Sequence, residues 1–378
     1  MTSELNMLGA YGPWAASLVP DTPGSYSWRN PQFTDLASWR QAAVAQLDER
    51  LGAPPIPSLP PVTVHRQFEY DGLHIEDLSW QLPYGPPTRA YLLKPAGATE
   101  PLPAVLGLHC HGGKKHWGRE KIVQVDEAGI GVMPYYRGVA WANELAKRGY
   151  VVLVHDAFAF ASRRVHLADI PPRIRDEFDP AIDDLSDGEA YNQWAARHES
   201  IMAKSLFAAG TTWPGVFLAE DRVALDLLCA RPDVDPARVG CGGLSGGGLR
   251  TVMLAGRDER IRCAVCVGMM TTWRDFLLNK SFNHTWMVYV PRLPHELDYP
   301  EILGLRVPLP TLVLNDSDDH LFTLPEMERA DSILQQIYAK AGASERYRCS
   351  YYPGPHKFDV PMQAEAFGWF DHWLVNSA

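Results

Sequence analysis

One stretch near the middle of the chain constrains the fold more than any other. It reads Val239-Gly-Cys-Gly-Gly-Leu-Ser-Gly-Gly-Gly-Leu-Arg250, and its centre has the pattern G-x-S-x-G around Ser245. The apolar run 239–241 predicts a strand, and the apolar residues of 251–256 predict the start of a helix. Between them the backbone must turn so sharply that side chains would collide, which accounts for the glycines. The pattern is typical of a nucleophile elbow, in which the turn raises one serine hydroxyl above the sheet.

Glycine-rich turns between a strand and a helix also bind phosphate, so the motif alone leaves two interpretations. A phosphate-binding loop of the G-x-x-x-x-G-K-[ST] type needs a lysine, and no lysine follows these glycines. A serine hydroxyl is a poor nucleophile until a base removes its proton and an acid orients that base. The hypothesis of a catalytic Ser245 therefore depends on partners elsewhere in the chain.

Composition and charge restrict the class of protein. The 378 residues are 46% hydrophobic and 21% charged, enough for one large domain with insertions or for two modest domains. The net charge of -10 argues against a nucleic-acid partner, and no run of about 18 apolar residues is present to span a membrane. The N-terminus has no secretory pattern. Cys263 and Cys266 lie in a predicted strand, where their side chains face opposite sides. We expect reduced thiols, no bound metal and a cytoplasmic protein.

Two parts of the chain differ in pattern. Residues 1–60 form a Pro-rich arm with one predicted helix at 33–51, and residues 61–378 form the main domain. The arm is too small for a core of its own, so we expect it to cover the main domain, and it is the segment through which a possible homodimer would form. The main domain begins with strands predicted at 62–70, 73–82 and 89–94, whose spacing favours an antiparallel meander.

From residue 104 onward, apolar runs alternate with helical patterns. Strands are predicted at 104–110, 150–155, 239–241, 261–267, 310–315 and 346–352, and helices at 139–148, 217–230 and 361–375. This alternation predicts an α/β fold with a mostly parallel twisted sheet and helices on both faces. Insertions near 157–213 and 269–300 leave the carboxyl ends of strands, where open α/β sheets bind ligands. We expect them to act as lids or pocket walls.

The acid of a triad is expected after a strand downstream of the serine. Three carboxylates, Asp316, Asp318 and Asp319, follow the predicted strand 310–315. Asp319 is favoured because the apolar residues at 321–322 would press its loop into the protein. The other two remain alternatives.

The base is expected after the last strand. His356 lies there, in a loop rich in Pro and Gly, and is the favoured residue. The alternatives are His284 and His295, in the second insertion, and His320, which adjoins the favoured acid in sequence.

An acyl-transfer site also needs N–H donors for the developing oxyanion. Gly246, the residue after the serine, is the first predicted donor. The loop after the strand 104–110 reads His109-Cys-His-Gly-Gly-Lys-Lys115, and the second donor is predicted to be Gly113 or Lys114. Lys114, Lys115 and Arg119 lie close to this loop in sequence. They either favour an anionic substrate group or are solvated surface charge, and the second interpretation is favoured.

Several further segments accompany these residues. They are Trp117-Gly-Arg-Glu-Lys121, Val234-Asp-Pro-Ala-Arg-Val-Gly240, Asp258-Glu-Arg-Ile-Arg262, Gly354-Pro-His-Lys-Phe358 and Trp369-Phe-Asp-His-Trp373. With the elbow and the His-Cys-His-Gly-Gly loop, the chain resembles the α/β-hydrolase superfamily across residues 85–378. Within it, the chain is most similar to dienelactone-hydrolase-like and acetyl-xylan-esterase-like bacterial esterases. Many relatives have Met where this chain has Gly246.

The resemblance implies a serine hydrolase that cleaves a small-molecule carboxylic ester through an acyl-enzyme, with no cofactor. The alternatives are a peptidase or amidase on the same triad, a lyase acting on a carbon-carbon bond, and a catalytically inactive binding protein. Aromatic residues in loops expected to border the pocket favour a bulky apolar or aromatic substrate group: Trp117, Tyr135, Tyr136, Trp273 and Trp286.

Overall fold

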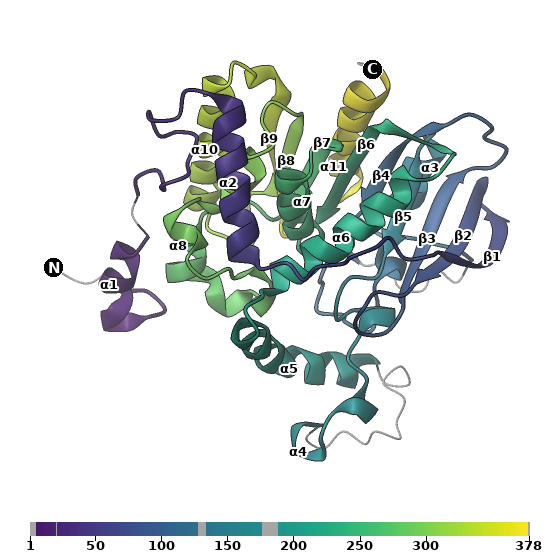
Figure 1. Cartoon of the computed structure of the whole chain (residues 1–378), viewed down its shortest axis with the longest axis horizontal. Helices are drawn as coiled ribbons and strands as arrows, with labels where there is room; N and C mark the ends of the chain where they lie inside the picture. The colour runs from purple at the N-terminus through teal and green to yellow at the C-terminus, as the bar shows by residue number, and fades with distance from the viewer. Residues whose placement is uncertain (1–4, 20, 128–133, 176–187, 377–378) are drawn as a thin grey trace.

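A nine-stranded sheet forms the centre of the molecule, as a computed structural model shows (Figure 1). The structure describes residues 5–19, 21–127, 134–175 and 188–376. The strands are β1 (Thr63–Tyr70), β2 (Leu73–Trp80), β3 (Thr88–Pro95), β4 (Leu102–Gly107), β5 (Val151–His155), β6 (Val234–Leu244), β7 (Ile261–Val267), β8 (Thr311–Asp316) and β9 (Tyr347–Tyr352). Their order across the sheet is β1-β2-β3-β5-β4-β6-β7-β8-β9.

The sheet is antiparallel at one edge and parallel over the rest. β1, β2 and β3 form the expected meander, and β3 pairs with β5 in the antiparallel sense. From β5 across to β9 every neighbouring pair is parallel. The predicted α/β architecture is therefore confirmed, and the carboxyl ends of the parallel strands meet at one edge, where the loops described below lie.

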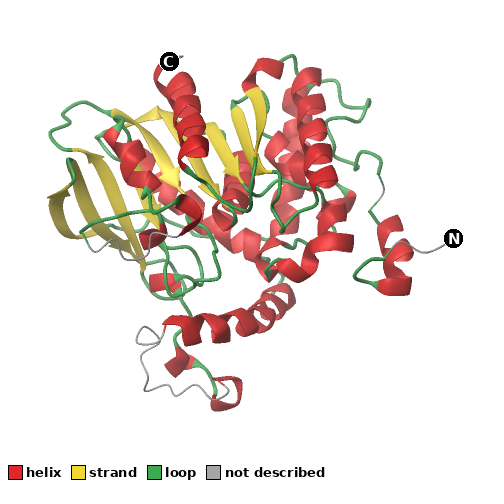
Figure 2. Cartoon of the chain, turned by 180° about the vertical axis from the view of Figure 1, so that it is seen from behind, coloured by secondary structure: helices red, strands yellow, loops and turns green. Residues whose placement is uncertain are grey.

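Helices cover both faces of the sheet. They are α1 (Gly12–Ser17), α2 (Leu36–Leu51), α3 (Trp141–Lys147), α4 (Pro172–Arg175), α5 (Gly188–Ala208), α6 (Trp213–Cys229), α7 (Gly246–Arg257), α8 (Trp273–Asp275), α9 (Tyr299–Gly304), α10 (Leu324–Lys340) and α11 (Val360–Phe370). Helices α2, α6, α7, α9 and α10 pack into one apolar cluster, and α3 and α11 pack into the other, seen from behind in Figure 2. Cys263 and Cys266 belong to opposite clusters, as the strand predicted, and both thiols are free.

Two differences from the prediction concern the first insertion and the helix that follows it. Helix α6 begins at Trp213 and not near residue 217, because the Thr212 side chain accepts a hydrogen bond from the Gly215 N–H and Pro214 suits the first turn. Helix α5, 21 residues long, lies inside the insertion 157–213, for which no regular element was predicted. Its buried side chains include Tyr191 and Trp194, and it lies below the sheet in Figure 1.

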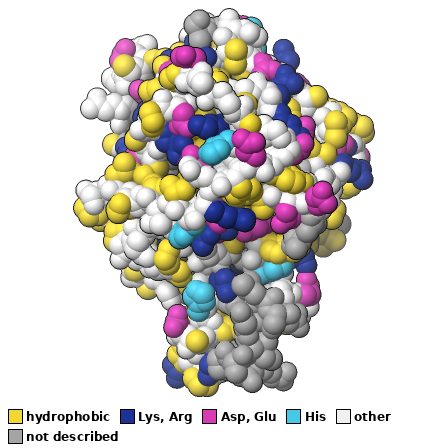
Figure 3. Space-filling model, turned by 90° about the vertical axis from the view of Figure 1, so that its right-hand side faces the viewer, with side chains coloured by type: hydrophobic (Ala, Val, Ile, Leu, Met, Phe, Trp, Pro, Cys, Tyr) yellow, Lys and Arg dark blue, Asp and Glu magenta, His cyan; other side chains and the backbone are white. Residues whose placement is uncertain are grey.

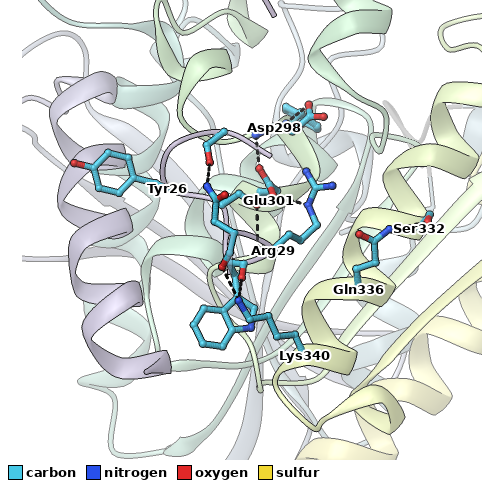
Figure 4. Close-up of polar contacts among 12 residues, drawn as sticks. Tyr26, Arg29, Asp298, Glu301, Ser332, Gln336 and Lys340 are labelled. Carbon is cyan, nitrogen blue, oxygen red and sulfur yellow. Dashed lines mark hydrogen bonds and ion pairs between the residues drawn. The ribbon is translucent and has the colours of Figure 1, made fainter. Parts of the chain in front are cut away.

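The N-terminal arm packs against the main body through α2. Trp39, Ala43 and Leu47 recur at helical spacing, are buried, and join the same cluster as α6 and α7. Polar contacts add to this packing, as Figure 4 shows: Arg29 Nε donates to Glu301 at 2.9 Å, and Lys340 Nζ donates to the Asn30 carbonyl at 2.8 Å.

The distribution of surface charge relates to the expectation about nucleic acid, and the length and apolar character of the helices relate to the expectation about membranes. On the face shown in Figure 3, basic and acidic side chains of the described residues are interspersed. Across the described residues, no helix combines the length and the apolar character needed to cross a bilayer.

Candidate active site

Ser245 stands at a sharp turn between β6 and α7. Its backbone has φ 58° and ψ -116°, a conformation that a non-glycine residue adopts only under strain of about 1–3 kcal/mol. Two backbone hydrogen bonds fix it: the Ser245 N–H donates to Val267 O at 2.9 Å, and the Leu249 N–H donates to Ser245 O at 2.8 Å. The glycines leave room for this turn, because a Cβ on Gly243 or Gly247 would lie 2.1 or 2.0 Å from the Leu108 carbonyl.

His356 and Asp319 form a hydrogen-bonded pair. His356 Nδ1 lies 2.6 Å from Asp319 Oδ2, and the carboxylate is buried. An ionised carboxylate can only accept a hydrogen bond, so the neutral imidazole carries its proton on Nδ1 and donates it to Asp319. Nε2 is then unprotonated and can act as a base. The arrangement is one that orients a general base.

The two other candidate acids contact the backbone of the same loop. Asp318 Oδ2 accepts from the Gly354 N–H at 2.8 Å, and Asp316 Oδ2 accepts from the Lys357 N–H at 2.9 Å. Both therefore position the loop that carries His356, whereas Asp319 alone among the three makes the direct hydrogen bond to its ring.

Asp316 is a second buried carboxyl group beside the pair. Burial raises its pKa to about 7, although the Lys357 N–H and His356 lower the pKa. Within the described part of the chain, its Oδ1 has no hydrogen-bond partner. Asp316, Asp319 and His356 also have the spacing of metal ligands. The short hydrogen bond between Asp319 and His356 already accounts for two of the three groups, so the cluster fits an acid–base pair better than a metal site.

Ser245 and His356 open onto the same cavity, which has a volume of about 300 Å³. Its lining comes from the loops after β4, β6, β8 and β9 and from the second insertion: Cys110, His111, Gly112, Gly113, Tyr135, Ser245, Asn283, His284, Thr285, His320, Leu321 and His356. The lining carries no Asp, Glu, Lys or Arg among the described residues.

The alternative bases have other surroundings. His284 Nε2 donates to the Leu321 carbonyl at 2.8 Å, and His320 is exposed at the cavity edge. His295 does not line the cavity. Among the described residues, none of the three makes a hydrogen bond or ion pair with Asp316, Asp318 or Asp319 through its ring, whereas His356 does.

The five aromatic residues expected at the pocket are distributed differently. Tyr135 lines the cavity, and its ring centroid lies 6.0 Å from that of His356. Tyr136 and Trp273 are buried in the apolar core. Trp286 is 41% exposed and Trp117 packs on His116, and neither lines the cavity. The structure thus brings one of the five to the site.

The loop after β4 contacts the elbow through His111. Both N–H groups predicted as the second oxyanion donor are already engaged: the Gly113 N–H donates to His111 Nδ1 at 3.0 Å and the Lys114 N–H to the His111 carbonyl at 3.2 Å. A Cβ on Gly246 would lie 2.8 Å from the backbone nitrogen of His111. Among the described residues the His111 N–H has no hydrogen-bond acceptor. The His111 N–H is therefore an unpaired donor whose nitrogen lies close to the elbow.

Lys115 and Arg119 are buried ion-pair partners and not solvated surface charge, which corrects the favoured interpretation. Lys115 Nζ lies 2.8 Å from Glu199 of α5, and Arg119 contacts Asp156 at 2.6 Å. Lys114, more exposed, pairs with Glu189 of the same helix α5. None of the three cations points its charge into the cavity.

A family model and a curated relative match parts of the chain. Residues 212–302 match the model of the prolyl oligopeptidase family. The chain is 28% identical over 288 residues to "putative hydrolase YtaP" of Bacillus subtilis (strain 168), covering 75% of this chain and 83% of that one.

Several solved structures with similar folds are esterases by name. A "putative acetyl xylan esterase" of Bacteroides fragilis NCTC 9343 has a TM-score of 0.66 at 16% identity, covering 92% of this chain and 83% of that one. A glucuronoyl esterase from Solibacter usitatus has a TM-score of 0.63 at 16% identity, covering 94% and 99%. At this identity the likeness establishes a shared fold.

Proposed function

We propose that this chain, a member of the α/β-hydrolase superfamily, is a serine hydrolase that cleaves carboxylic esters. The observation that carries the proposal is that Ser245, at its strained turn, and His356, hydrogen-bonded to the buried Asp319, line one cavity. Along the chain they follow the order nucleophile, acid and base, which is the order of the superfamily.

Each residue has a distinct role. Ser245 Oγ attacks the ester carbonyl while His356 Nε2 takes its proton, and Asp319 stabilises the imidazolium. The N–H groups of Gly246 and His111 bind the oxyanion, since the first residue of a helix has no intrahelical acceptor for its N–H. The protonated His356 then gives its proton to the leaving alcohol. Water activated by the same imidazole hydrolyses the acyl-enzyme, and the mechanism uses groups of the chain and water only.

A peptidase or amidase on the same triad is the second candidate, because residues 212–302 match the prolyl oligopeptidase family. Recognition of a free peptide amine requires a carboxylate near the scissile bond. The described lining residues include none, which argues against a peptidase that binds a free N-terminal amine. The cavity of about 300 Å³ suits a small acyl group, with Tyr135 as its aromatic contact.

The test combines labelling with turnover. A fluorescent phosphonate is expected to label the wild-type protein and not Ser245→Ala, which also loses hydrolysis of p-nitrophenyl acetate. Comparing kcat/KM for acetyl, aryl and sugar esters with that for p-nitroanilides separates esterase from amidase. A wild-type protein that is neither labelled nor active would support the binding-protein alternative.

A further inference from the structure

Lys121 is a fully buried lysine behind the loop that carries His111. It ends the short helical turn Arg119–Lys121, and its ammonium lies 4.5 Å from the centroid of the Phe160 ring. Lys115 and Arg119 nearby each contact a carboxylate, but Lys121 Nζ donates to two backbone carbonyls, those of Cys110 and His111, both at 2.9 Å. Burying an ammonium group that contacts carbonyls and no carboxylate costs free energy. Burial lowers the pKa of Lys121 to about 8. The ester-hydrolysis mechanism assigns it no role.

The two carbonyls define the orientation of the oxyanion loop. The Cys110–His111 peptide is trans and planar, so the Cys110 C=O and the His111 N–H point in opposite directions. A donor that fixes the carbonyl therefore fixes the direction of the N–H. Lys121 Nζ contacts that carbonyl from the interior, and the N–H on the other side faces Gly246.

His109 supplies a second donor to the same carbonyl. Its Nε2 accepts from the Ala157 N–H at 3.1 Å, which places the ring proton on Nδ1. Nδ1 lies 3.0 Å from the Cys110 carbonyl oxygen and donates to it. Two buried side chains thus fix one peptide unit, in the manner of groups that orient the residues of a catalytic site.

We propose that Lys121 is a positioning residue that aims the His111 N–H at the oxyanion. The inference rests on the proposed function of Ser245 and adds a residue that touches neither the substrate nor the triad. Lys121 contacts the loop in the free protein, so it orients the donor before the substrate arrives. Its absence therefore affects the transition state, where the oxyanion develops, more than substrate binding.

The test is Lys121→Met, which keeps the aliphatic side chain and removes the donor. We expect kcat for p-nitrophenyl acetate to fall roughly 10- to 100-fold, less than the loss of a whole oxyanion donor, with KM changed by less than about threefold. The inhibition constant of a trifluoromethyl ketone that mimics the tetrahedral intermediate is expected to rise by a similar factor. Lys121→Gln, which keeps a shorter donor, is expected to lie between wild type and Lys121→Met, and it serves as the readout where Lys121→Met does not fold.

Lys94→Met is the matched control. Lys94 Nζ pairs with Asp233 at 2.8 Å, remote from the cavity lining, so this variant loses a partly buried amine with no contact to the oxyanion loop. Its kcat is expected to equal that of the wild type. Phosphonate labelling distinguishes the two hypotheses: an unlabelled, inactive wild type refutes the proposed function. A labelled, active wild type refutes the role of Lys121 if the folded Lys121 variants retain kcat within threefold, or if only KM changes.

Discussion

Glu199 of helix α5 accepts a hydrogen bond from His111 Nε2 at 3.0 Å. The same carboxylate pairs with Lys115 Nζ, and Asn192 of α5 accepts from the Lys115 N–H at 2.7 Å. Helix α5 is therefore fixed to the loop that presents the His111 N–H, and the first insertion contributes to the geometry of the site without lining the cavity.

Removing the Glu199 carboxylate is expected to destabilise the protein. Glu199→Ala leaves the buried ammonium of Lys115 without its counter-charge, at a cost of about 3–5 kcal/mol in the free energy of unfolding. Glu189→Ala is the control on the same helix, because Glu189 pairs with Lys114 at the surface, and it is expected to leave stability almost unchanged. Urea unfolding measures both. Equal losses for the two variants would contradict the assignment.

The stability of the wild type is also expected to fall in acid through Glu199. Burial opposes ionisation, but the hydrogen bond from His111 and the charge of Lys115 outweigh it and lower the pKa of Glu199 to about 2. A depressed folded-state pKa stabilises the protein above the unfolded pKa, near 4.3, and this contribution is lost as pH falls toward 2. Glu199→Gln lacks this dependence. The difference in unfolding free energy between wild type and variant is expected to shrink between about pH 4.5 and 2, and a constant difference would exclude the effect.

A methyl group at Gly246 is expected to impair catalysis. The Cβ of Gly246→Ala would lie 2.8 Å from the backbone nitrogen of His111, so the two oxyanion donors must separate. Because one donor contributes about 10²–10³ in kcat, we expect a loss of roughly 10- to 1,000-fold with the fold intact. The backbone of His111 occupies the space that a side chain at position 246 would need.

Gly368→Ala provides the contrast for that substitution. Gly368 lies in α11 with no atom within 4 Å of the added Cβ, so Ala is expected to stabilise the helix by about 0.5–1 kcal/mol and leave kcat unchanged. Steady-state kinetics and thermal unfolding of both variants check the pair. Wild-type kcat in Gly246→Ala would show that His111 does not contribute a donor.

Substitutions of Asp319 and Asp318 are expected to affect enzymatic activity differently. Asp319→Asn loses the hydrogen bond that sets the tautomer of His356, and kcat is expected to fall on the order of 10³–10⁴. Asp318→Asn keeps an acceptor for the Gly354 N–H and is expected to retain kcat within several-fold. Kinetics on p-nitrophenyl acetate distinguish them. Similar losses in both variants would show that the carboxylates act only through the loop.

The sequence predicts the sheet well because its parallel strands are buried on both faces. Such strands read as nearly continuous apolar runs, as 104–110 and 261–267 do. The elbow glycines are required because a Cβ on Gly243 or Gly247 would lie about 2 Å from the Leu108 carbonyl. Helix α5 has a weaker pattern, since its inner face mixes Trp194 with His198 and Glu199. Its partners are polar groups of a distant loop, which no local periodicity reveals.

The His111 N–H, which we propose as the second oxyanion donor, was not among the predicted donors for a related reason. Which N–H of the His-Cys-His-Gly-Gly loop faces Gly246 depends on the direction of one peptide, and the contact of Lys121 with Cys110 sets that direction. This contact spans eleven residues in sequence. The direction of the Trp273 side chain was equally hidden from the sequence. The insertion that carries Trp273 contributes to the cavity wall, but the Trp273 side chain lies in the core and donates to the Leu297 carbonyl.

Asp316 is expected to make the stability of the protein depend on pH near neutrality. Burial raises its pKa from 3.8 to about 7, so the folded state favours the protonated carboxyl group. A raised folded-state pKa stabilises the protein fully below the unfolded pKa, and this contribution is lost as pH rises through 7. Asp316→Asn is neutral throughout and keeps an acceptor for the Lys357 N–H. Its unfolding free energy relative to wild type is therefore expected to increase between about pH 4 and 7 and then level off. Urea unfolding of the wild type and of Asp316→Asn at several pH values measures this difference; a flat curve would show that Asp316 is ionised in the folded protein across this range.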